Sequence, residues 1–442
     1  GQAPTRDNPV HRWSSTGKFG WAPWIAADGK YATLIITQQV DIRGRRAAPE
    51  SRWQIARASS LRGLRASDEA LVQLPRAEHG VDRRPENLQS ALNAIRTPTA
   101  ARKRGTPGKQ SRPKSTTVDM HAHVAIPQAG AIAGPHVDPA KVPLDHFSTP
   151  ETKAIMAKQA ADIGDRIRNT DARFKVMDEM GVDVQLISPG PPQLYYTIPL
   201  DIAVKATQAL NDGIAEYIGK HTDRLCALGG VPLSDADEAV KELERCMKQL
   251  KFKGVEILTN VDGKELSDPA FAPFWKKAEE LGALVMIHPN GFTEADRLSR
   301  FYFNNVIGNP LETTIALHYL IFDGVLERHP NLKIFAVHGG GYLGAYHGRI
   351  DHAWGARADA HASLPKPPTH YLKKIIFDTV VFTPGQLKAL VETYGADHVV
   401  LGTDYPFDMA DFDPVEHVVS TGFDAAATAA ICGGNAKRLL GL

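Results

Sequence analysis

The sequence predicts an α/β fold, a (β/α)8 TIM-type barrel in which eight parallel strands alternate with helices. From residue 117 onwards, short β-branched or apolar runs alternate with longer stretches whose apolar residues recur at three- and four-residue spacings. Eight such runs occur. Glycine or proline closes most units, as at Gly181 and Gly395, where helix ends belong. A doubly wound open sheet is the alternative, but this pattern closes most economically into a barrel.

The predicted elements follow one another in a regular order. The strands are Thr117–His121, Val182–Ser188, Leu225–Gly230, Gly254–Thr259, Leu284–His288, Lys333–His338, Lys374–Asp378 and His398–Asp404. The helices include Ile202–Ile218, Ala236–Leu250, Pro269–Leu281, Leu311–Arg328 and Pro384–Tyr394. The segment from Val124 to Asp171, rich in proline and glycine and then helical, is expected to cover the mouth of the barrel.

The chain divides into two parts of different charge. Residues 117–442 form the predicted barrel, and residues 1–116 form a basic N-terminal extension and linker. Residues 1–115 contain 21 Lys and Arg against 9 Asp and Glu, whereas the whole chain contains 51 against 50. Scattered Arg, Pro, Ser and Gly with weak helical periodicity favour a poorly ordered extension over an arm for nucleic acid. We therefore expect no nucleic-acid partner.

The composition is that of a soluble globular protein, with 43% hydrophobic and 23% charged residues. No apolar stretch approaches the roughly 20 residues that span a bilayer, and no signal-peptide pattern is evident. The three cysteines, Cys226, Cys246 and Cys432, are widely spaced and form no C-x-x-C pair. These features favour a cytoplasmic protein with no membrane partner, no disulfide framework and no thiolate metal site.

Polar residues occupy the predicted strand ends, where the catalytic groups of such barrels converge. His121 and His123, in VDMHAHV, share one face of the first strand because side chains alternate along a strand. His288 ends the fifth strand in LVMIHP, and Asp404 ends the eighth in VVLGTDYPF. Three imidazoles and a carboxylate suit Zn or a similar divalent ion, with a position open to water or substrate. We therefore predict a metal ion on these four residues.

Three further strand residues are candidates for supporting roles. His338, in IFAVHGGG, is expected to exchange protons beside the metal, with a metal ligand or a helix cap as the alternatives. Asp378, in IIFDT, is expected either to orient a ligand or to cap a strand end. Glu256, in GVEILTN, could point into the barrel, but a packed, hydrogen-bonded core carboxylate or an outward-facing one is expected instead.

Five segments resemble a known family. VDMHAHV, MIHPNG, GNPLETTIAL, FAVHGGGYLGAYHGRIDHAW and VVLGTDYPFD are similar, in this order and spacing, to the aminocarboxymuconate-semialdehyde decarboxylase branch of the amidohydrolase superfamily. The resemblance covers residues 117–442 and not the basic extension. It implies the ligand set already named, with Asp404 also in the catalytic centre and His338, from the H-G-G-G motif, as the catalytic histidine.

The resemblance also implies a role for Arg349. In the family, the arginine of the G-R-I-D segment reaches a substrate carboxylate in the neighbouring subunit, which implies a homodimer. Taken alone, Arg349 would be assigned to a surface or interhelical ion pair. The family's second substrate-binding arginine has no clear counterpart, although Arg166, Arg168 and Arg173 lie near the expected position.

The predicted function is non-oxidative decarboxylation of a small unsaturated or aromatic carboxylic acid by a metal-dependent carbon–carbon lyase. The fourth strand has no lysine at its end, which argues against a carboxylated lysine between two metals and favours one ion, zinc or else manganese. The alternative is a hydrolase or hydratase of the same superfamily, because activated water can attack a carbonyl or alkene with similar ligands. A non-catalytic binding protein would not need His338 beside intact ligands.

Overall fold

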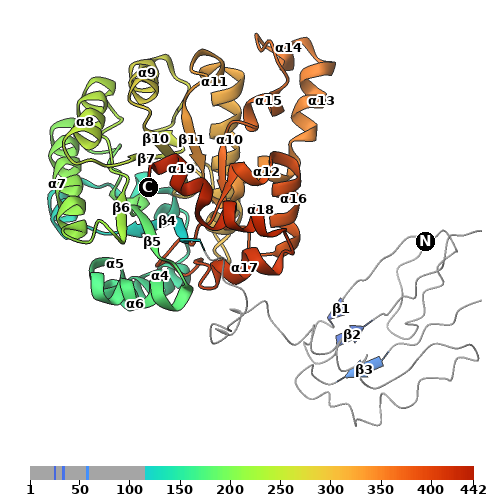
Figure 1. Ribbon diagram of the computed structural model, residues 1–442, viewed down its shortest axis with the longest axis horizontal. Helices are drawn as coiled ribbons and strands as arrows, with labels where there is room; N and C mark the ends of the chain where they lie inside the picture. The colour runs from blue at the N-terminus through green and yellow to red at the C-terminus, as the bar shows by residue number, and fades with distance from the viewer. Residues whose placement is uncertain (1–23, 26–31, 35–55, 59–114) are drawn as a thin grey trace, which may run out of the picture. The chain divides into compact units, whose positions relative to one another are not determined.

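The computed structural model describes residues 24–25, 32–34, 56–58 and 115–442 (Figure 1). The chain divides into two compact units, residues 1–103 and 104–442. In the first unit, three short strands pair in an antiparallel sheet: β1 (Trp24–Ile25), β2 (Ala32–Leu34) and β3 (Ala56–Ala58). The prediction of a poorly ordered extension over residues 1–116 otherwise falls outside the described residues.

The second unit contains parallel strands at all eight predicted places. They are β4 (Val118–Val124), β5 (Val184–Pro189), β6 (Leu225–Ala227), β7 (Gly254–Leu258), β10 (Leu284–His288), β11 (Lys333–Ala336), β12 (Ile376–Asp378) and β13 (Val399–Val400). Two parallel sheets result, in the orders β4-β5-β6 and β13-β12-β11-β10-β7. Isolated parallel bridges join the two sheets at both of their edges. Gly229, after β6, pairs with Val255 in β7. Ala122, in β4, pairs with Tyr405, which follows β13.

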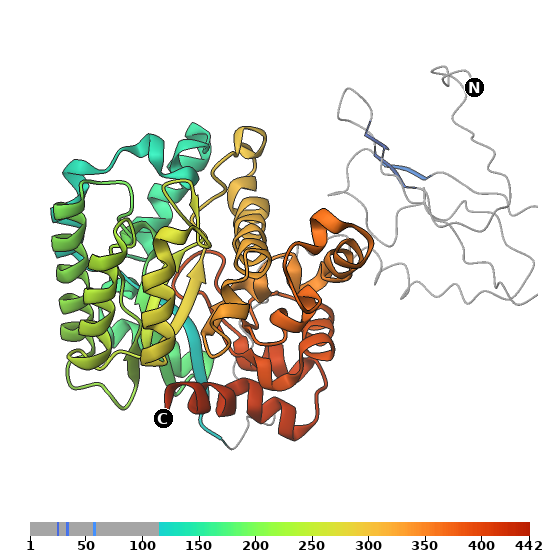
Figure 2. The same ribbon diagram turned by 90° about the horizontal axis from the view of Figure 1, so that it is seen from above.

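Helices connect these strands and lie outside them (Figure 1). The principal ones are α6 (Thr170–Met180), α7 (Leu200–Ile218), α8 (Ala236–Lys248), α9 (Ala272–Leu281), α10 (Asn309–Phe322), α11 (Val325–Arg328) and α16 (Pro384–Tyr394). In the view from above, the green helices lie on one side of the strands and the orange and red helices on the other (Figure 2). The single helix predicted over residues 311–328 is two helices, because Gly324 adopts φ 72° between α10 and α11.

The unit contains further helices. They are α2 (Pro127–Ala133), α3 (Pro143–His146), α4 (Pro150–Asp162), α5 (Gly164–Arg168), α12 (Leu343–Tyr346), α13 (Gly348–Ala356), α14 (Ala358–His361), α15 (Pro368–Leu372), α17 (Pro414–Ser420), α18 (Ala425–Ala429) and α19 (Asn435–Leu440). The first four belong to the segment inserted after β4. Residues 137–147 of this segment line a cavity together with the loops that follow β5, β7 and β10. The segment therefore covers carboxyl ends of strands, as expected.

Alternation along the strands separates two buried clusters. In β10, Val285 and Ile287 belong to the larger cluster, which also contains the buried faces of the helices. Leu284 and Met286 belong to the second cluster, together with buried residues of β4, β11 and α19. Because side chains alternate, His288 continues the face of Leu284 and Met286, away from the outer helices. The polar end of this inner face is the site described next.

Two predictions concern disulfide bonds and membrane-spanning helices. Cys226, Cys246 and Cys432 are buried and unpaired, so none of them forms a disulfide. Within the part of the chain that the structure describes, no helix is both long and apolar enough to cross a membrane.

Candidate metal centre

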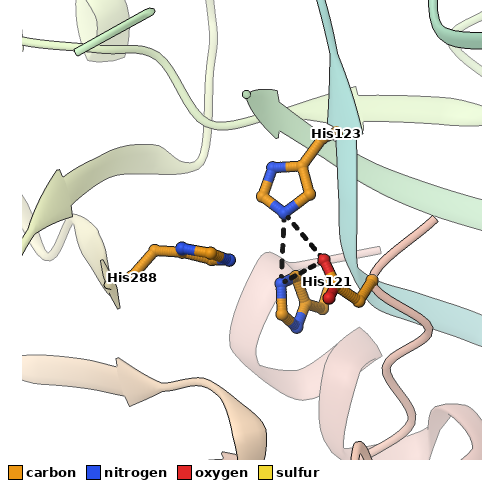
Figure 3. Close-up of side chains that lie close together, drawn as sticks. His121, His123 and His288 are labelled. Carbon is orange, nitrogen blue, oxygen red and sulfur yellow. Dashed lines mark hydrogen bonds and ion pairs between the residues drawn. The ribbon is translucent and has the colours of Figure 1, made fainter. Parts of the chain in front are cut away.

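The structure brings the four predicted ligands together. One donor atom from each of His121, His123, His288 and Asp404 lies within 4.8 Å of the others, and all four residues are buried. Figure 3 shows the rings of His121 and His123 with nitrogen atoms facing each other, and His288 approaching from another strand. Residues more than 280 positions apart thus meet at the carboxyl ends of three strands.

The local backbone explains how these side chains are aimed. The register between β4 and β5 shifts between Asp119 and Ala122, and such irregularities re-aim side chains beside active sites. After the shift, Ala122 packs into the outer cluster, whereas His121 and His123 share the opposite face. Asp404 lies just beyond β13 with φ 60°, a left-handed conformation that non-glycine residues rarely adopt. Its strain is of the kind found at functional sites.

Hydrogen bonds fix which nitrogen each histidine presents. Nδ1 of His123 lies 2.9 Å from the carbonyl oxygen of Pro189, and Nδ1 of His288 lies 2.7 Å from that of Pro289. A carbonyl only accepts, so each Nδ1 carries the proton and each Nε2 keeps its lone pair. Nδ1 of His121 donates to Oδ2 of Asp378 at 2.7 Å, with the same consequence. Such partners are the usual way of orienting metal-binding imidazoles.

The donor atoms leave a place for a cation. The Nε2 atoms of His121 and His123 are 3.2 Å apart, and Oδ1 of Asp404 lies 3.5 Å and 3.3 Å from them. Two nitrogens bound tetrahedrally to one zinc ion are about 3.3 Å apart, given Zn–N bonds of about 2.0 Å. Nε2 of His288 and Oδ1 of Asp404 are buried without a hydrogen-bond partner among the described residues. Facing lone pairs and unpartnered atoms fit a divalent ion.

The charge states of three of the four residues agree with this interpretation, whereas for His123 burial would lower the pKa but its contact with Asp404 and the charge of Glu256 raise it. Burial lowers the pKa of His121, although its hydrogen bond with Asp378 opposes the shift. Burial, followed by the charges of His123 and His338, places the pKa of His288 well below its usual value. Burial would raise the pKa of Asp404, but its contacts with His123 and His338 hold that pKa well below the usual range. Two neutral imidazoles and a carboxylate anion are the protonation states that bind a metal.

His338 lies beside these ligands. Its ring centroid is 5.2 Å from that of His121 and 5.1 Å from that of His288, and its Nε2 is 3.6 Å from Oδ2 of Asp404. His338 follows β11 and has φ 54°, so the chain turns sharply there, before Gly339, Gly340 and Gly341. Its Nδ1 is buried and has no hydrogen-bond partner among the described residues. The arrangement leaves an imidazole next to the four donors and 15% exposed.

Asp378 supports both His121 and the turn at His338. Its Oδ2 accepts from the backbone N–H of His338 at 3.0 Å, and its Oδ1 from that of Gly339 at 2.8 Å. Asp378 therefore both orients a predicted ligand and caps the end of β11, which are the two roles that the sequence left open. Sequence gave no means of choosing, because both roles use the same carboxylate.

Glu256 differs from its expected environment. It is fully buried in β7, as one alternative held, but neither carboxylate oxygen has a hydrogen-bond partner among the described residues. Its Oε2 lies 3.7 Å from Nδ1 of His123. Burial raises the pKa of Glu256 to about 7. Glu256 therefore points inward toward His123, as the alternative had it, and the expectation of a hydrogen-bonded core carboxylate or an outward-facing one was wrong.

The arginines occupy different environments. Arg349 is exposed on α13, outside the cluster of donor atoms. Arg173 is fully buried and donates to the carbonyl oxygen of His123, to Gln185 and to the hydroxyl of Tyr217. It therefore supports the strand that carries two predicted ligands. Sequence reasoning missed this role, since one basic residue in an amphipathic helix leaves no periodic signal.

Comparison with known proteins agrees with this site. The Amidohydrolase family model matches residues 118–442. A 2-amino-3-carboxymuconate-6-semialdehyde decarboxylase of Dictyostelium discoideum is 33% identical over 332 residues, which cover 74% of this chain and 92% of that protein.

Two solved structures are similar as well. A 2,6-dihydroxybenzoate decarboxylase complexed with 2,6-dihydroxybenzoate is 26% identical, with a TM-score of 0.61 over 74% of this chain and all of that one. A dihydroxybenzoic acid decarboxylase of Polaromonas sp. JS666, with bound manganese and 2-nitroresorcinol, has the same kind of fold at 22% identity, with a TM-score of 0.62 over 74% of this chain and 97% of that one. The chain belongs to the amidohydrolase family, in its aminocarboxymuconate-semialdehyde decarboxylase-like branch of metal-dependent carboxy-lyases.

Proposed function

We propose that this chain removes CO2, without oxidation, from an unsaturated or aromatic carboxylic acid. The observation that carries the proposal is the position of His338, whose Nε2 lies 3.6 Å from Asp404 beside four buried metal-binding candidates. A decarboxylase must return a proton to the carbon that loses CO2, and a partly exposed imidazole can deliver it. Membership in a decarboxylase branch supports the same chemistry.

We infer that the eight strands close into a (β/α)8 barrel, since parallel bridges join the two sheets at both pairs of edges. His121, His123, His288 and Asp404 would then hold one divalent ion at its carboxyl-terminal mouth. Nitrogen and carboxylate ligands favour zinc, with manganese as the alternative. When bound, the ion supplies a positive charge that orients a substrate oxygen and activates water.

The protein's own residues carry the remaining steps. The bond between the carboxylate and its carbon breaks, CO2 leaves, and the electron pair stays on that carbon. His338 then gives its proton to the same carbon, so the reaction consumes one proton and releases one CO2. Asp378 holds the turn at His338 in place through the backbone N–H of His338 and of Gly339.

Arg349 is proposed to bind a substrate carboxylate in the partner subunit of a homodimer. A guanidinium binds a carboxylate through two parallel hydrogen bonds. Near Arg349 in the chain, Tyr342 and Tyr346 are 41% and 66% exposed. In another segment, Phe301 is 71% exposed. The Tyr342 hydroxyl donates to the carbonyl oxygen of Ile307, which joins these two segments. Exposed aromatic side chains of this kind suit an interface with a second copy.

The cytoplasm is the proposed location. All three cysteines are unpaired, as is usual in a reducing compartment.

The direct experiment is metal analysis followed by a CO2-release screen across muconate semialdehydes and hydroxybenzoates. We expect one CO2 for each acid consumed and no oxygen from labelled water at a new carbon–oxygen bond in the product. A product that carries solvent oxygen at such a bond would instead identify a hydrolase or hydratase.

A further inference from the structure

A cavity of about 420 Å³ lies between the inserted segment and the loops that follow β5, β7 and β10. One wall is formed by residues 137–147 of the inserted segment, and the others by residues 192–198, 258–263 and 290–293. Its volume falls in the range of about 300–1,000 Å³ that is usual for small-molecule sites. The other three walls are loops that follow the carboxyl ends of β5, β7 and β10, where the active sites of such folds lie.

Strand register places one wall of the cavity next to the strand that carries His288. Leu258 lines the cavity and is paired with His288 in the ladder between β7 and β10. Asn290, two residues beyond His288, lines it as well. When the carboxylate of a small acid lies near His288, the rest of that acid can therefore extend into this cavity.

Tyr196 is the unsatisfied polar group of this cavity. It lines the wall and is only 4% exposed, yet its hydroxyl has no hydrogen-bond partner among the described residues. Burial raises the pKa of Tyr196, and the nearby backbone of Leu258 opposes this shift only in part. A phenol is neutral at pH 7, so the hydroxyl has a proton to donate. An unpaired buried hydroxyl costs about 1–3 kcal/mol, which a ligand oxygen would recover.

The charges that line the cavity are balanced. Nζ of Lys141 lies 3.1 Å from Oδ2 of Asp262, which joins the inserted segment to the loop after β7. His146 lies at the exposed rim, with its ring 4.6 Å from that of Phe147. No arginine of the described chain lines this space. A second carboxylate buried here would lack a free cation, whereas a neutral oxygen would meet the Tyr196 hydroxyl.

We propose that this cavity receives the part of the substrate remote from the reacting carboxylate, and that the Tyr196 hydroxyl donates a hydrogen bond to a neutral oxygen substituent there. The substituent is a hydroxyl or a carbonyl of an unsaturated or aromatic acid. Tyr196 is then a specificity-determining residue. This inference rests on the proposed decarboxylase function and adds the chemical class of the substituent that the enzyme selects.

The first test compares Tyr196→Phe with the wild type on two acids. One is an oxygen-substituted acid that the wild type decarboxylates, and the other is its analogue with hydrogen in place of that oxygen. We expect kcat/KM to fall about tenfold for the first acid and to change little for the second. An equal fall for both acids, or no fall for either, would overturn the inference.

A matched control separates specificity from folding. Tyr371 is also buried, but its hydroxyl donates to Glu327 at 2.8 Å, and neither residue lines the cavity. Tyr371→Phe should lower the melting temperature and leave the preference between the two acids unchanged. Tyr196→Phe should lower the melting temperature less than Tyr371→Phe does, because the Tyr196 hydroxyl has no partner in hydrogen-bonding geometry among the described residues. A large loss of stability in Tyr196→Phe would point to a structural role and reject ours.

Calorimetric binding makes the test independent of turnover. If the wild type releases CO2 from no acid, the proposed function fails, and the cavity is then judged by titrating the metal-loaded protein with benzoate, 2,6-dihydroxybenzoate and 3,4-dihydroxybenzoate. Binding of a hydroxylated acid about tenfold tighter than benzoate in the wild type, but not in Tyr196→Phe, would support the role of Tyr196. Equal preferences in the two proteins, or no binding to the wild type, would refute it.

Discussion

Asp378 accepts a hydrogen bond from Nδ1 of His121 at 2.7 Å, so that a buried carboxylate turns Nε2 of this imidazole toward the other donor atoms. The same carboxylate accepts from the backbone N–H groups of His338 and Gly339. A proposed metal ligand and the proposed proton donor therefore share one support. The orientation of the His121 ring and the backbone turn at His338 are therefore coupled, although the two residues belong to β4 and to the end of β11.

Asp378→Asn should weaken metal binding by about 10–100-fold, because an amide cannot hold the imidazole as a carboxylate does. Competition with a chelator, followed by metal analysis, measures the loss. Asp359→Asn is the control, since Asp359 pairs with Arg357 at the exposed surface. Unchanged metal affinity in Asp378→Asn would remove the orienting role.

His288→Ala and Asp404→Ala should lose bound metal and decarboxylation together. Each substitution removes one of four converging donors, and three donors hold a divalent ion much less tightly. Elemental analysis after dialysis gives the metal content. The control is His318→Ala. The His318 ring belongs to α10, where its Nδ1 lies 2.7 Å from the carbonyl oxygen of Thr314. Near-stoichiometric metal in either site variant would reject that ligand assignment.

His338→Ala should keep its metal and lose turnover by about 100- to 10,000-fold, the usual contribution of a positioned acid or base. The relevant measurement is kcat for CO2 release per bound metal ion. Loss of the metal along with turnover would make His338 a ligand instead. Catalysis near that of the wild type would exclude its role in proton transfer.

Arg349→Ala and His338→Ala should complement each other when the two chains are coexpressed. If Arg349 acts in the partner subunit, each mixed dimer contains one intact site, and a statistical mixture recovers about a quarter of wild-type activity. Each variant alone should be nearly inactive. The mixture would stay inactive if Arg349 served its own subunit, and light scattering would show a monomer if there were no dimer.

Arg173→Met should destabilise the fold by about 3–5 kcal/mol, because it leaves buried hydrogen-bond acceptors without their charged donor. Among these acceptors is the carbonyl oxygen of His123. The free energy of unfolding in urea measures the effect. Arg357→Met is the matched control, because Arg357 is 67% exposed and its loss should change stability by less than about 1 kcal/mol. Equal stability of the two variants would contradict a supporting role for Arg173.

The strand pattern was predictable because it is local. Leu284–His288 has the bounds expected from a short apolar run, and α16 has those expected from apolar spacing that ends before Gly395. Helix continuity was less predictable, because Gly324 divides a periodic stretch into two helices. Periodicity records which face is buried and does not report a change of backbone direction.

Local sequence is enough to predict where the strands lie along the chain and which donor types end them, because alternation and strand-end chemistry depend on neighbouring residues. The tertiary structure decided what depends on distance between remote segments. It placed Asp378 against His121, left Glu256 without a hydrogen-bond partner, buried Arg173 under His123, and set Tyr196 beside an open cavity. Each of these relationships joins different strands, helices or loops, and only the packing of the whole fold brings such residues together.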